Sequence, residues 1–440
     1  MQACHLPHKK PVTLPGLDAP EHHFAPGTPA IVIGAGIAGC ALTRSLVKTG
    51  FRCVVYDKHR AIASETSAVP RALIRPHVTR LEQTSTRYFN EAYRKIYAEL
   101  YNDAPESTRL KQHHRSQLDG VLQLVTDVTH WPENPYYSKL TRAEASDLAG
   151  TQLAGDALYF GQAGSLNMAG LCDHWFRQCN DAKQQAAEFI GETVVHSLRQ
   201  TDYGWQLIDA DNQVINESPL VIIASAQVAS QLTQTTHLPL QKSRGQMSHF
   251  TSDPATTGCI PKHIITGKGS VIPTTTGFWA GSTHQQQIDS SRLSTRDDQL
   301  NLQKAIELCP QLDQLLVNQT AETTVNNGST RHSWAGVRYS TPDRLPVAGA
   351  APIEDWYKQH YADLHHGRRQ QIFPRARFHK GLYLLTGFGS RGALHSVYAA
   401  EILAGVITGD AMQSSDDCVN ANHRLLHPGR FIIRQLRRSS

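Results

Sequence analysis

The glycine pattern Gly34-x-Gly36-x-x-Gly39 restricts the fold of this chain more than any other feature. It follows a short apolar run, residues 30–33, and opens a segment with helical periodicity. Glycines at such a strand–helix turn let backbone N–H groups and the positive end of the helix dipole approach a pyrophosphate, because no Cβ blocks the way. The pattern therefore predicts a βαβ unit that binds a dinucleotide; a glycine turn without a ligand is the less favoured alternative.

A carboxylate completes this pattern. Residues 51–57 predict a second strand, and Asp57 ends it. A carboxylate at this place can accept hydrogen bonds from the hydroxyl groups of a ribose. The motif by itself does not distinguish NAD from FAD.

A second glycine cluster, residues 387–392 (GFGSRG), lies far downstream. It separates an apolar strand expected at 381–386 from a helix expected at 392–407. A second junction of this kind can direct another helix N-terminus at the far end of a long cofactor, where the helix dipole would favour an anionic reduced flavin. The cluster favours FAD over NAD, although a plain helix start is an alternative.

The remaining elements predict an α/β fold with two domains, as expected for 440 residues. We expect a Rossmann-like FAD-binding domain with a central parallel sheet, and a substrate domain built on a mostly antiparallel sheet. The FAD-binding domain is expected to be discontinuous, with residues 30–85, 160–240 and 336–425, and the substrate domain to consist of residues 86–159 and 241–335. Within them we expect a helix at 81–101, a hairpin at 193–210, a buried strand at 220–224 and a helix at 297–308.

The two ends of the chain differ from these domains. Residues 1–29 carry six prolines among several histidines and predict a disordered arm. Residues 426–440 form a basic C-terminal tail: from His366 onwards the chain has eleven Lys/Arg and only four Asp/Glu. Such a run is usually a solvated face, which composition alone favours, but it can also contact nucleic-acid phosphates.

Composition excludes several classes of protein. No pair of the eight cysteines has C-x-x-C spacing, so we expect neither a metal site nor disulfides. No run approaches the ~20 apolar residues of a membrane span, and residues 1–29 lack the pattern of a secretory signal. We expect a cytoplasmic protein without a metal and without membrane association.

Several blocks of sequence resemble a known family. They are residues 244–249, 336–338, 343–346, 389–392, 400–403 and the ending 426–431. On these blocks the chain resembles the D-amino-acid-oxidase-like FAD oxidoreductases, such as glycine oxidase and sarcosine oxidase. Within that group it looks most like the FAD-dependent oxidase half of MnmC, the bifunctional enzyme that modifies the tRNA wobble uridine. The likeness runs from about Ala30 to Arg438 and includes no methyltransferase half, so we expect a stand-alone oxidase domain. Residues 66–69 depart from the family pattern Ala-Ser-Gly-Asn and keep only its serine.

The resemblance implies FAD as the cofactor and assigns roles to individual residues. The expected cofactor-binding residues are Gly34, Gly36, Ile37, Ala38, Gly39, Asp57, Lys58, Ser67, Val194, Gly387, Gly389, Ser390, Arg391 and Gly392. Arg338 is the expected catalytic residue, because its guanidinium would hold a glycine-like carboxylate with the α-carbon facing the flavin. Further contacts to the substrate or to tRNA are expected from Arg244, Arg434, Arg437 and Arg438.

The family's reaction supplies a specific expectation. It is the removal of the carboxymethyl group from 5-carboxymethylaminomethyl-(2-thio)uridine at the tRNA wobble position, which gives 5-aminomethyl-uridine and glyoxylate. A tRNA substrate makes phosphate contacts by the basic tail more plausible, and a separate methyltransferase could act on the product. Two alternatives remain: a small-molecule secondary-amine or amino-acid oxidase of the glycine or sarcosine type, and a non-catalytic flavin- and tRNA-binding protein.

Overall fold

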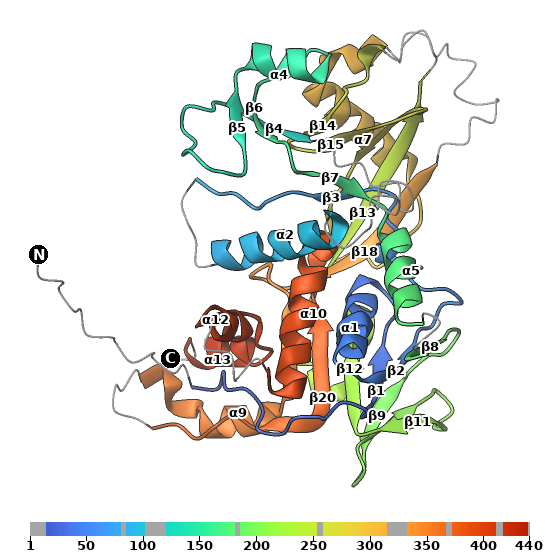
Figure 1. Ribbon diagram of the computed structural model, residues 1–440, viewed down its shortest axis with the longest axis vertical. Coiled ribbons are helices and arrows are strands. Elements are labelled where there is room, and N and C mark those ends of the chain that lie inside the picture. Colours follow the sequence, from blue (N-terminus) through green and yellow to red (C-terminus); the bar gives the residue numbers. More distant parts are fainter. Residues whose placement is uncertain are drawn as a thin grey trace, which may run out of the picture.

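The computed structural model arranges the chain in two lobes, stacked along the longest axis of the molecule (Figure 1). The structure describes residues 15–80, 85–101, 120–180, 185–252, 258–314, 332–366, 372–410 and 417–438.

A six-stranded sheet forms the centre of the lower lobe. Its order is β19-β20-β12-β1-β2-β8, and all neighbours are parallel except β19 and β20, which are antiparallel. The strands are β1 (Pro29–Ile33), β2 (Arg52–Tyr56), β8 (Ala187–Ile190), β12 (Leu220–Ile223), β19 (Val347–Pro352) and β20 (Phe378–Thr386). The predicted Rossmann-like parallel sheet is therefore confirmed, with an antiparallel strand at one edge.

Both faces of this sheet are covered, so its strands are apolar on both sides. Ala30 and Val32 belong to a core cluster with the helices, whereas Ile31 and Ile33 face a second cluster that contains Trp205. The second cluster lies beneath the small antiparallel sheet β9 (Ser197–Gln200), β10 (Trp205–Ile208) and β11 (Val214–Ser218). The hairpin expected at 193–210 is the β9–β10 pair.

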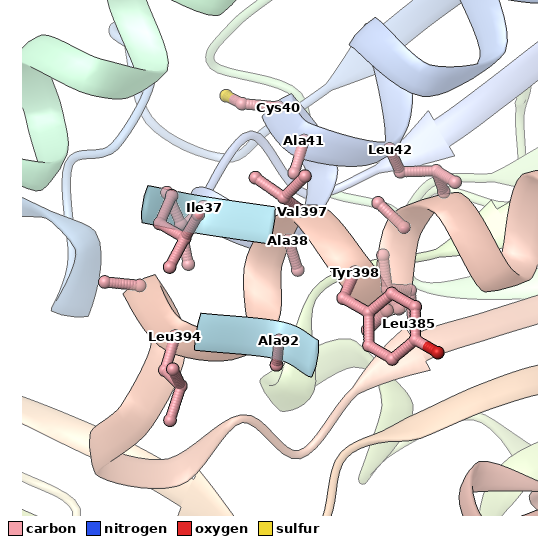
Figure 2. Packing of buried hydrophobic residues seen from close by; sticks show 14 of the residues in the cluster. Ile37, Ala38, Cys40, Ala41, Leu42, Ala92, Leu385, Leu394, Val397 and Tyr398 are labelled. Carbon is pink, nitrogen blue, oxygen red and sulfur yellow. The ribbon is translucent and has the colours of Figure 1, made fainter. Parts of the chain in front are cut away.

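Four helices cover the other face. They are α1 (Ile37–Lys48), α2 (Thr86–Tyr101), α5 (Met168–Gln178) and α10 (Gly392–Thr408). Helix α10 lies between α1 and α2, and α5 packs on α1. Figure 2 shows Ile37 and Ala38 of α1 in one buried cluster with Leu394 and Val397 of α10 and Ala92 of α2. Because it has neighbours on several sides, α10 is apolar on most of its surface.

The upper lobe is built on a larger sheet with the order β17-β13-β16-β15-β14-β4-β6-β5, in which β18 also pairs with β13. Its strands are β4 (Val121–Val125), β5 (Ser138–Leu140), β6 (Asp156–Phe160), β13 (Gln241–Thr251), β14 (Ile264–Thr266), β15 (Ser270–Thr274), β16 (Gly277–Gly281), β17 (Gln285–Gln286) and β18 (Ser333–Ser340). All pairs are antiparallel except β14 and β4. The expected mostly antiparallel sheet is confirmed.

The smaller elements complete the two lobes. Helices α4 (Arg142–Ala149) and α7 (Thr295–Leu308) lie in the upper lobe, and α7 packs on β13, β15 and β16. Strands β3 (Ala72–Ile74) and β7 (Gly164–Leu166) form a pair of their own. The remaining helices are α6 (Ala226–Ala229), α9 (Glu354–His360), α12 (Asp417–Leu426) and α13 (Arg430–Leu436), with short 3-10 turns that include η1 (Thr66–Ala68) and η8 (Gly389–Arg391).

Two segments, β18 and α2, pack in the other domain from the one to which the expected boundaries assign them, wholly or in part. The boundary expected at residue 336 falls inside β18, which belongs to the large sheet because it pairs with β13 along its length. Helix α2, expected in the substrate domain, packs instead on α10 of the FAD-binding domain. Both differences come from contacts between segments far apart in the sequence, which local patterns do not reveal.

The second half of the arm that we expected to be disordered is ordered, which corrects this expectation. Residues 15–29 lie against the lower lobe, where Leu17 and Phe24 are buried. The hydroxyl of Tyr357 donates to the carbonyl of Gly16 over 3.0 Å, and a carboxylate oxygen of Asp18 accepts from a backbone N–H over 3.0 Å. These buried side chains and satisfied polar groups order the segment. The rest of the expected arm, positions 1 to 14, lies outside the described part of the chain.

The basic C-terminal tail is folded as well. Helix α13 buries Ile432 and Ile433 against α9, so its inner face is part of a small core. Arg430 is buried, and its guanidinium grips both carboxylate oxygens of Asp343 at 3.0 and 3.1 Å. Arg434 makes a second ion pair with the same carboxylate. Asp343 therefore ties the C-terminal helix to the loop between β18 and β19.

This ion-pair cluster should make the stability of the protein depend on acid pH. Burial alone would raise the pKa of Asp343, but hydrogen bonds and charge from Arg430 and Arg434 outweigh it and lower the pKa to about 2. A depressed pKa stabilises the folded state above the ordinary Asp value of ~3.9, and this contribution is lost as the pH falls towards 2. Its size is about 2 kcal/mol.

Asp343→Asn tests the contribution by urea unfolding between pH 7 and pH 2. We expect the variant to be less stable at pH 7, because Arg430 remains buried without its partner. The gap between variant and parent should narrow as the pH falls from about 4 to about 2. Asp202→Asn, in the exposed β9–β10 turn, is the control; a gap for Asp343→Asn that is constant with pH would contradict the assignment.

Candidate active site

A cavity of about 550 Å³ lies where the two sheets meet, and both glycine turns line it. Gly34 and Gly36 contribute from the β1–α1 turn, and Gly387 and Gly389 contribute from the turn between β20 and α10. The two turns come from distant parts of the sequence, near its beginning and near its end. Their meeting around one cavity is the arrangement that a single elongated cofactor would require.

The β1–α1 turn presents a helix N-terminus to this cavity. Gly34 has φ +108°, which favours glycine, and a Cβ there would lie 2.7 Å from the backbone N of Ser225. Gly36 caps α1 without a side-chain hydrogen bond of its own, and the N–H of Ile37 donates to Oγ of Ser67 over 2.9 Å. A Cβ on Gly39 would lie 1.8 Å from the carbonyl oxygen of Gly34, so glycine is what lets the helix pack on its own turn. The turn has the features of an anion cradle.

Asp57 lies beside this cradle at the end of β2. Its carboxylate accepts from the backbone N–H groups of Ala35 and His59, at 2.8 and 2.9 Å, and it lines the cavity. Two residues expected nearby are not in the cavity wall. Lys58 pairs with Glu65 over 2.7 Å, and the side chain of Val194 is 58% exposed.

The second turn brings the N-terminus of α10 against that of α1. A Cβ on Gly392 would lie 3.2 Å from the Cγ2 atom of Ile37, so the first residues of the two helices are in contact. Gly387 and Gly389 have φ values of +75° and +56°. Ser390 lines the cavity, whereas the side chain of Arg391 points elsewhere, with its Cζ 5.0 Å from the ring centre of Phe89.

Arg338 is a buried cation in the cavity wall. It belongs to β18 and is 9% exposed, and within the described residues it has no carboxylate partner. Its contacts are with Oγ of Ser282 at 3.3 Å and Nδ1 of His284 at 3.4 Å. Burial lowers the pKa of Arg338 to about 10, so the guanidinium stays charged at neutral pH. A buried charge without a partner is costly, and an anion entering the cavity would relieve that cost.

Gly245 makes room for this guanidinium. A Cβ on Gly245 would lie 2.5 Å from Nη1 and 2.8 Å from Cζ of Arg338. The glycine stands on β13, next to β18 in the sheet. The backbone of one strand therefore forms the back wall of the arginine site on the other.

His284 is a cavity residue that the sequence did not single out. Burial, with the nearby charges of Arg338 and Lys304, lowers the pKa of His284 to about 4, so the ring is neutral. An arginine can only donate, so Nδ1 of His284 accepts from it and Nε2 carries the hydrogen. The cavity thus offers a charged and a neutral donor side by side. No sequence signal marked His284, because it is distant from Arg338 in the chain and only the fold brings the two side chains together.

Arg244 was expected to contact the substrate, but its side chain is buried away from the cavity. It is 3% exposed and pairs with Asp297 of α7. It donates further hydrogen bonds to Gln246 at 2.8 Å, to Gln285 at 3.0 Å and to the carbonyl of Arg292. It does not line the cavity. We therefore assign Arg244 a structural role: it fixes β13 to α7. Of the expected tail contacts, Arg434 pairs with Asp343, while Arg437 and Arg438 are exposed.

Comparison with known proteins identifies the family. A family model described as FAD dependent oxidoreductase (DAO) matches residues 30–406. The chain belongs to this FAD-dependent oxidoreductase family. It is an FAD-dependent oxidoreductase, and the predicted cofactor, FAD, is confirmed.

Curated relatives of this FAD-dependent oxidoreductase confirm the likeness to MnmC. The chain is 28% identical over 426 residues to the tRNA 5-methylaminomethyl-2-thiouridine biosynthesis bifunctional protein MnmC of Stutzerimonas stutzeri (strain A1501), covering 93% of this chain and 60% of that protein. The protein of that name from Legionella pneumophila (strain Lens) is 25% identical over 419 residues, covering 92% and 58%. The chain spans about three-fifths of the length of these relatives.

Solved structures with this fold agree. Glycine oxidase from Geobacillus kaustophilus superposes with a TM-score of 0.62 at 18% identity, covering 86% of this chain and 95% of that one. L-proline dehydrogenase from P. horikoshii gives a TM-score of 0.66 at 15% identity, covering 93% and 98%. At these identities the likeness establishes the shared fold.

The residues in the cavity fit FAD. The cradle at Gly34 and Gly36 suits the pyrophosphate, Asp57 can accept from a ribose, and the N-terminus of α10 can face the flavin end. A Cβ on Gly36 would meet Oγ of Ser67 at 3.1 Å and otherwise open space, so the glycine keeps this side of the cradle clear. In the described part of the chain, no helix is long and apolar enough to cross a membrane, and no cluster of His, Cys, Asp and Glu could hold a metal ion.

Proposed function

We propose that the protein oxidatively removes the carboxymethyl group from 5-carboxymethylaminomethyl-(2-thio)uridine at the tRNA wobble position, which yields 5-aminomethyl-uridine and glyoxylate. The observation that carries the proposal is Arg338, a buried guanidinium for which the described residues provide no carboxylate partner, in the wall of the cavity that both glycine turns line. The curated relatives are named for the biosynthesis of a tRNA 5-methylaminomethyl-2-thiouridine.

The cofactor and the residues of the cavity have different roles in this reaction. When bound, FAD supplies the hydride acceptor that no side chain provides. Arg338 holds the carboxylate of the substrate with a two-pronged hydrogen bond. The Nε2–H of His284, which lies 3.4 Å from Oγ of Ser282, can turn to the carboxylate as a second donor. This grip fixes the adjacent CH₂ group relative to the cofactor, and such positioning is the main contribution of the protein.

The reaction balances with one water molecule and one two-electron acceptor. The secondary amine loses two electrons and two protons across its C–N bond and becomes an imine. Water then adds to the imine carbon and the C–N bond breaks, which releases glyoxylate and leaves the primary amine on the uridine. The amine must be neutral to lose hydride, and the loss builds positive charge on its nitrogen. Because the pKa of His284 is lowered to about 4, its ring is neutral and adds no positive charge that would oppose the loss of hydride.

The two alternatives differ in what they require. An oxidase for glycine or sarcosine would use the same Arg338 site but no polyanion-binding surface. A non-catalytic protein would need the altered segment 66–69 to have lost its contacts. In the structure Ser67 still accepts from the N–H of Ile37, and Thr66 donates to the carbonyl of Val337. The altered segment thus still joins the cofactor cradle to the strand of Arg338, which favours catalysis.

The experiment is anaerobic mixing of the holoprotein with tRNA whose modification stops at the carboxymethylaminomethyl stage. We expect the flavin band to bleach and one glyoxylate to form for each flavin reduced. The same tRNA without the carboxymethyl group is the control and should leave the band unchanged. Bleaching by glycine or sarcosine but not by the tRNA would select the small-molecule oxidase, and no bleaching by any of them would select the non-catalytic protein.

A further inference from the structure

Three arginines beside the cavity lack an acidic partner among the described residues. Arg75 follows β3 and lines the cavity, and its guanidinium donates to the carbonyl of Pro76 over 3.0 Å. Arg391 ends η8, at the start of α10, and Arg344 lies in the loop between β18 and β19. We call Arg75, Arg344 and Arg391 the arginine cluster.

The members of the arginine cluster lie close enough for their charges to act on one another. Burial and then the charge of Arg391 lower the pKa of Arg75 to about 10, and burial followed by Arg344 lowers that of Arg391. His77 lies among them: burial and then Arg391, Arg75 and Arg344 lower its pKa to about 4. A backbone bridge between Ser340 and Phe388 holds η8 close to the end of β18. The loop that contains Arg344 begins at this end of β18.

Aromatic rings lie between these charges. The Cζ of Arg391 is 5.0 Å from the ring centre of Phe89, and that of Arg75 is 5.5 Å from the ring centre of Phe160. The ring of His77 is 4.5 Å from Phe89. Phe89 and Phe160 are buried, so these contacts hold the two guanidinium groups in place from the inside, and the cation–π attraction partly offsets the cost of burying their charge.

Arg75 and Arg391, which are partly buried whereas Arg344 is exposed, contrast with the buried arginines elsewhere in the chain. Arg44 pairs with Glu99 at 2.6 Å, Arg430 pairs with Asp343 at 3.0 Å, and Arg244 pairs with Asp297. In each of these cases the fold supplies the carboxylate that an interior cation needs. Within the described part of the chain, the arginine cluster has like charges close together with ring contacts to offset their repulsion. Such an arrangement is stabilised when an anion from outside binds between them.

The number of anionic groups on each candidate ligand indicates which ligand the arginine cluster binds. Arg338 is already available for one carboxylate. Glycine and sarcosine each carry one carboxylate and would leave the arginine cluster unused. A nucleotide within a polynucleotide carries a phosphodiester besides the carboxylate on its modified base, so it can satisfy both sites at once.

We propose that Arg75, Arg344 and Arg391 bind a backbone phosphate of the RNA next to the nucleoside whose carboxymethyl group enters the cavity. This inference rests on the proposed function and adds a second contact to the same substrate, beside the place where Arg338 binds its carboxylate. The site also connects to the C-terminal helix, because Asp343, the chain neighbour of Arg344, pairs with Arg434 of α13. The exposed Arg437 and Arg438, which follow the last residue of α13, would extend the phosphate-binding surface past the end of that helix.

The test compares an anticodon stem-loop with the free nucleoside, both carrying 5-carboxymethylaminomethyl-uridine, as substrates of the full-length holoprotein. The variant is Arg344→Asn with Arg391→Gln. Asn is chosen because Arg344 has φ +59°, a conformation that Asn tolerates. We expect the ratio of kcat/KM for the stem-loop to kcat/KM for the nucleoside to fall by about ten- to a hundredfold. The slope of log binding constant against log salt should decrease by about 0.7 for each phosphate interaction that the substitutions remove.

Two further variants keep the test decisive. Arg344→Lys retains the charge and should recover most of the ratio, which a purely structural role of Arg344 would not predict. Arg199→Gln, on the exposed strand β9 at the far end of the lower lobe (Figure 1), should change neither the ratio nor the slope. The flavin content is measured for every variant.

The outcomes separate this inference from the proposed function. An unchanged ratio and slope in the double variant, or a loss of bound flavin, would overturn the phosphate site, the latter because the arginines would then serve the cofactor. Oxidation of the nucleoside but not of the stem-loop by the parent protein would overturn it too. If the parent oxidises neither, the proposed function fails, and the salt dependence of stem-loop binding still decides the arginine cluster.

Discussion

Arg338→Ala should lower kcat/KM for the carboxymethylaminomethyl substrate by about two to three orders of magnitude while FAD stays bound. Removing one partner of a buried, hydrogen-bonded charge pair costs ~2–5 kcal/mol, and each ~1.4 kcal/mol is a factor of ten. The flavin absorbance of the purified variant should equal that of the parent, because the cofactor cradle lies on other elements. Single-turnover flavin reduction by the substrate provides the measurement.

A neutral substrate analogue shows whether the effect belongs to the carboxylate. The analogue replaces the carboxylate by a primary amide, which cannot form the charged two-pronged pair. The parent should use the analogue poorly, and Arg338→Ala should lower its rate by less than about tenfold. An equal loss for acid and amide would mean that Arg338 acts on the fold or on the cofactor instead of the carboxylate.

Gly245→Ala provides a second approach to the same site without changing its charge. The new methyl group would lie 2.5 Å from Nη1 of Arg338, so the guanidinium must move. We expect a loss in kcat/KM in the same direction as for Arg338→Ala, with the larger part in KM if the arginine still reaches the carboxylate at a poorer angle. Gly258→Ala, where a Cβ would meet nothing within 4 Å, is the matched control.

The sequence predicts the cofactor cradle because all of its parts are close together in the chain. The glycine turn, the helix after it and the carboxylate all fall in the one βαβ unit between Gly34 and Asp57. Each obeys a local rule: glycine for close approach, period for the helix, a carboxylate after the strand. The second turn was identified by the same local signs. That the two turns share one cavity followed from neither, since it depends on how β1, β12 and β20 are ordered in the sheet.

The arginines show where sequence reasoning stops. Arg338 and Arg244 both lie in blocks that resemble the family, and both were expected to contact the substrate. In the sheet Arg338 stands opposite Ser243, and Arg244 stands opposite Val337. Opposite residues share a face and adjacent residues alternate, so the two arginines project from opposite faces. One face of the sheet lines the cavity and the other lies under α7. Only the pairing register of β13 and β18, which are distant in the sequence, determines which arginine lies on which face.

Gly36→Val should give a folded protein that retains little or no FAD. The backbone of Gly36 has φ −75°, which any residue adopts, so the substitution strains neither the turn nor the helix start. A Cβ there would lie 3.1 Å from Oγ of Ser67 and would otherwise project into the open cradle. The added methyl groups would therefore occupy space that the pyrophosphate needs, in contact with the first N–H groups of α1. We expect the affinity for FAD to fall by about a hundredfold or more, or ~3 kcal/mol.

The ratio of flavin absorbance to protein absorbance after gel filtration measures the retention of FAD, and circular dichroism checks the fold. Gly39→Ala is the contrasting variant, because its Cβ would lie 1.8 Å from the carbonyl oxygen of Gly34 and the clash is with backbone. It should lower the melting temperature even without cofactor, whereas Gly36→Val should leave the melting temperature of the apoprotein close to that of the parent. Normal flavin content in Gly36→Val would show that the pyrophosphate does not bind at this turn.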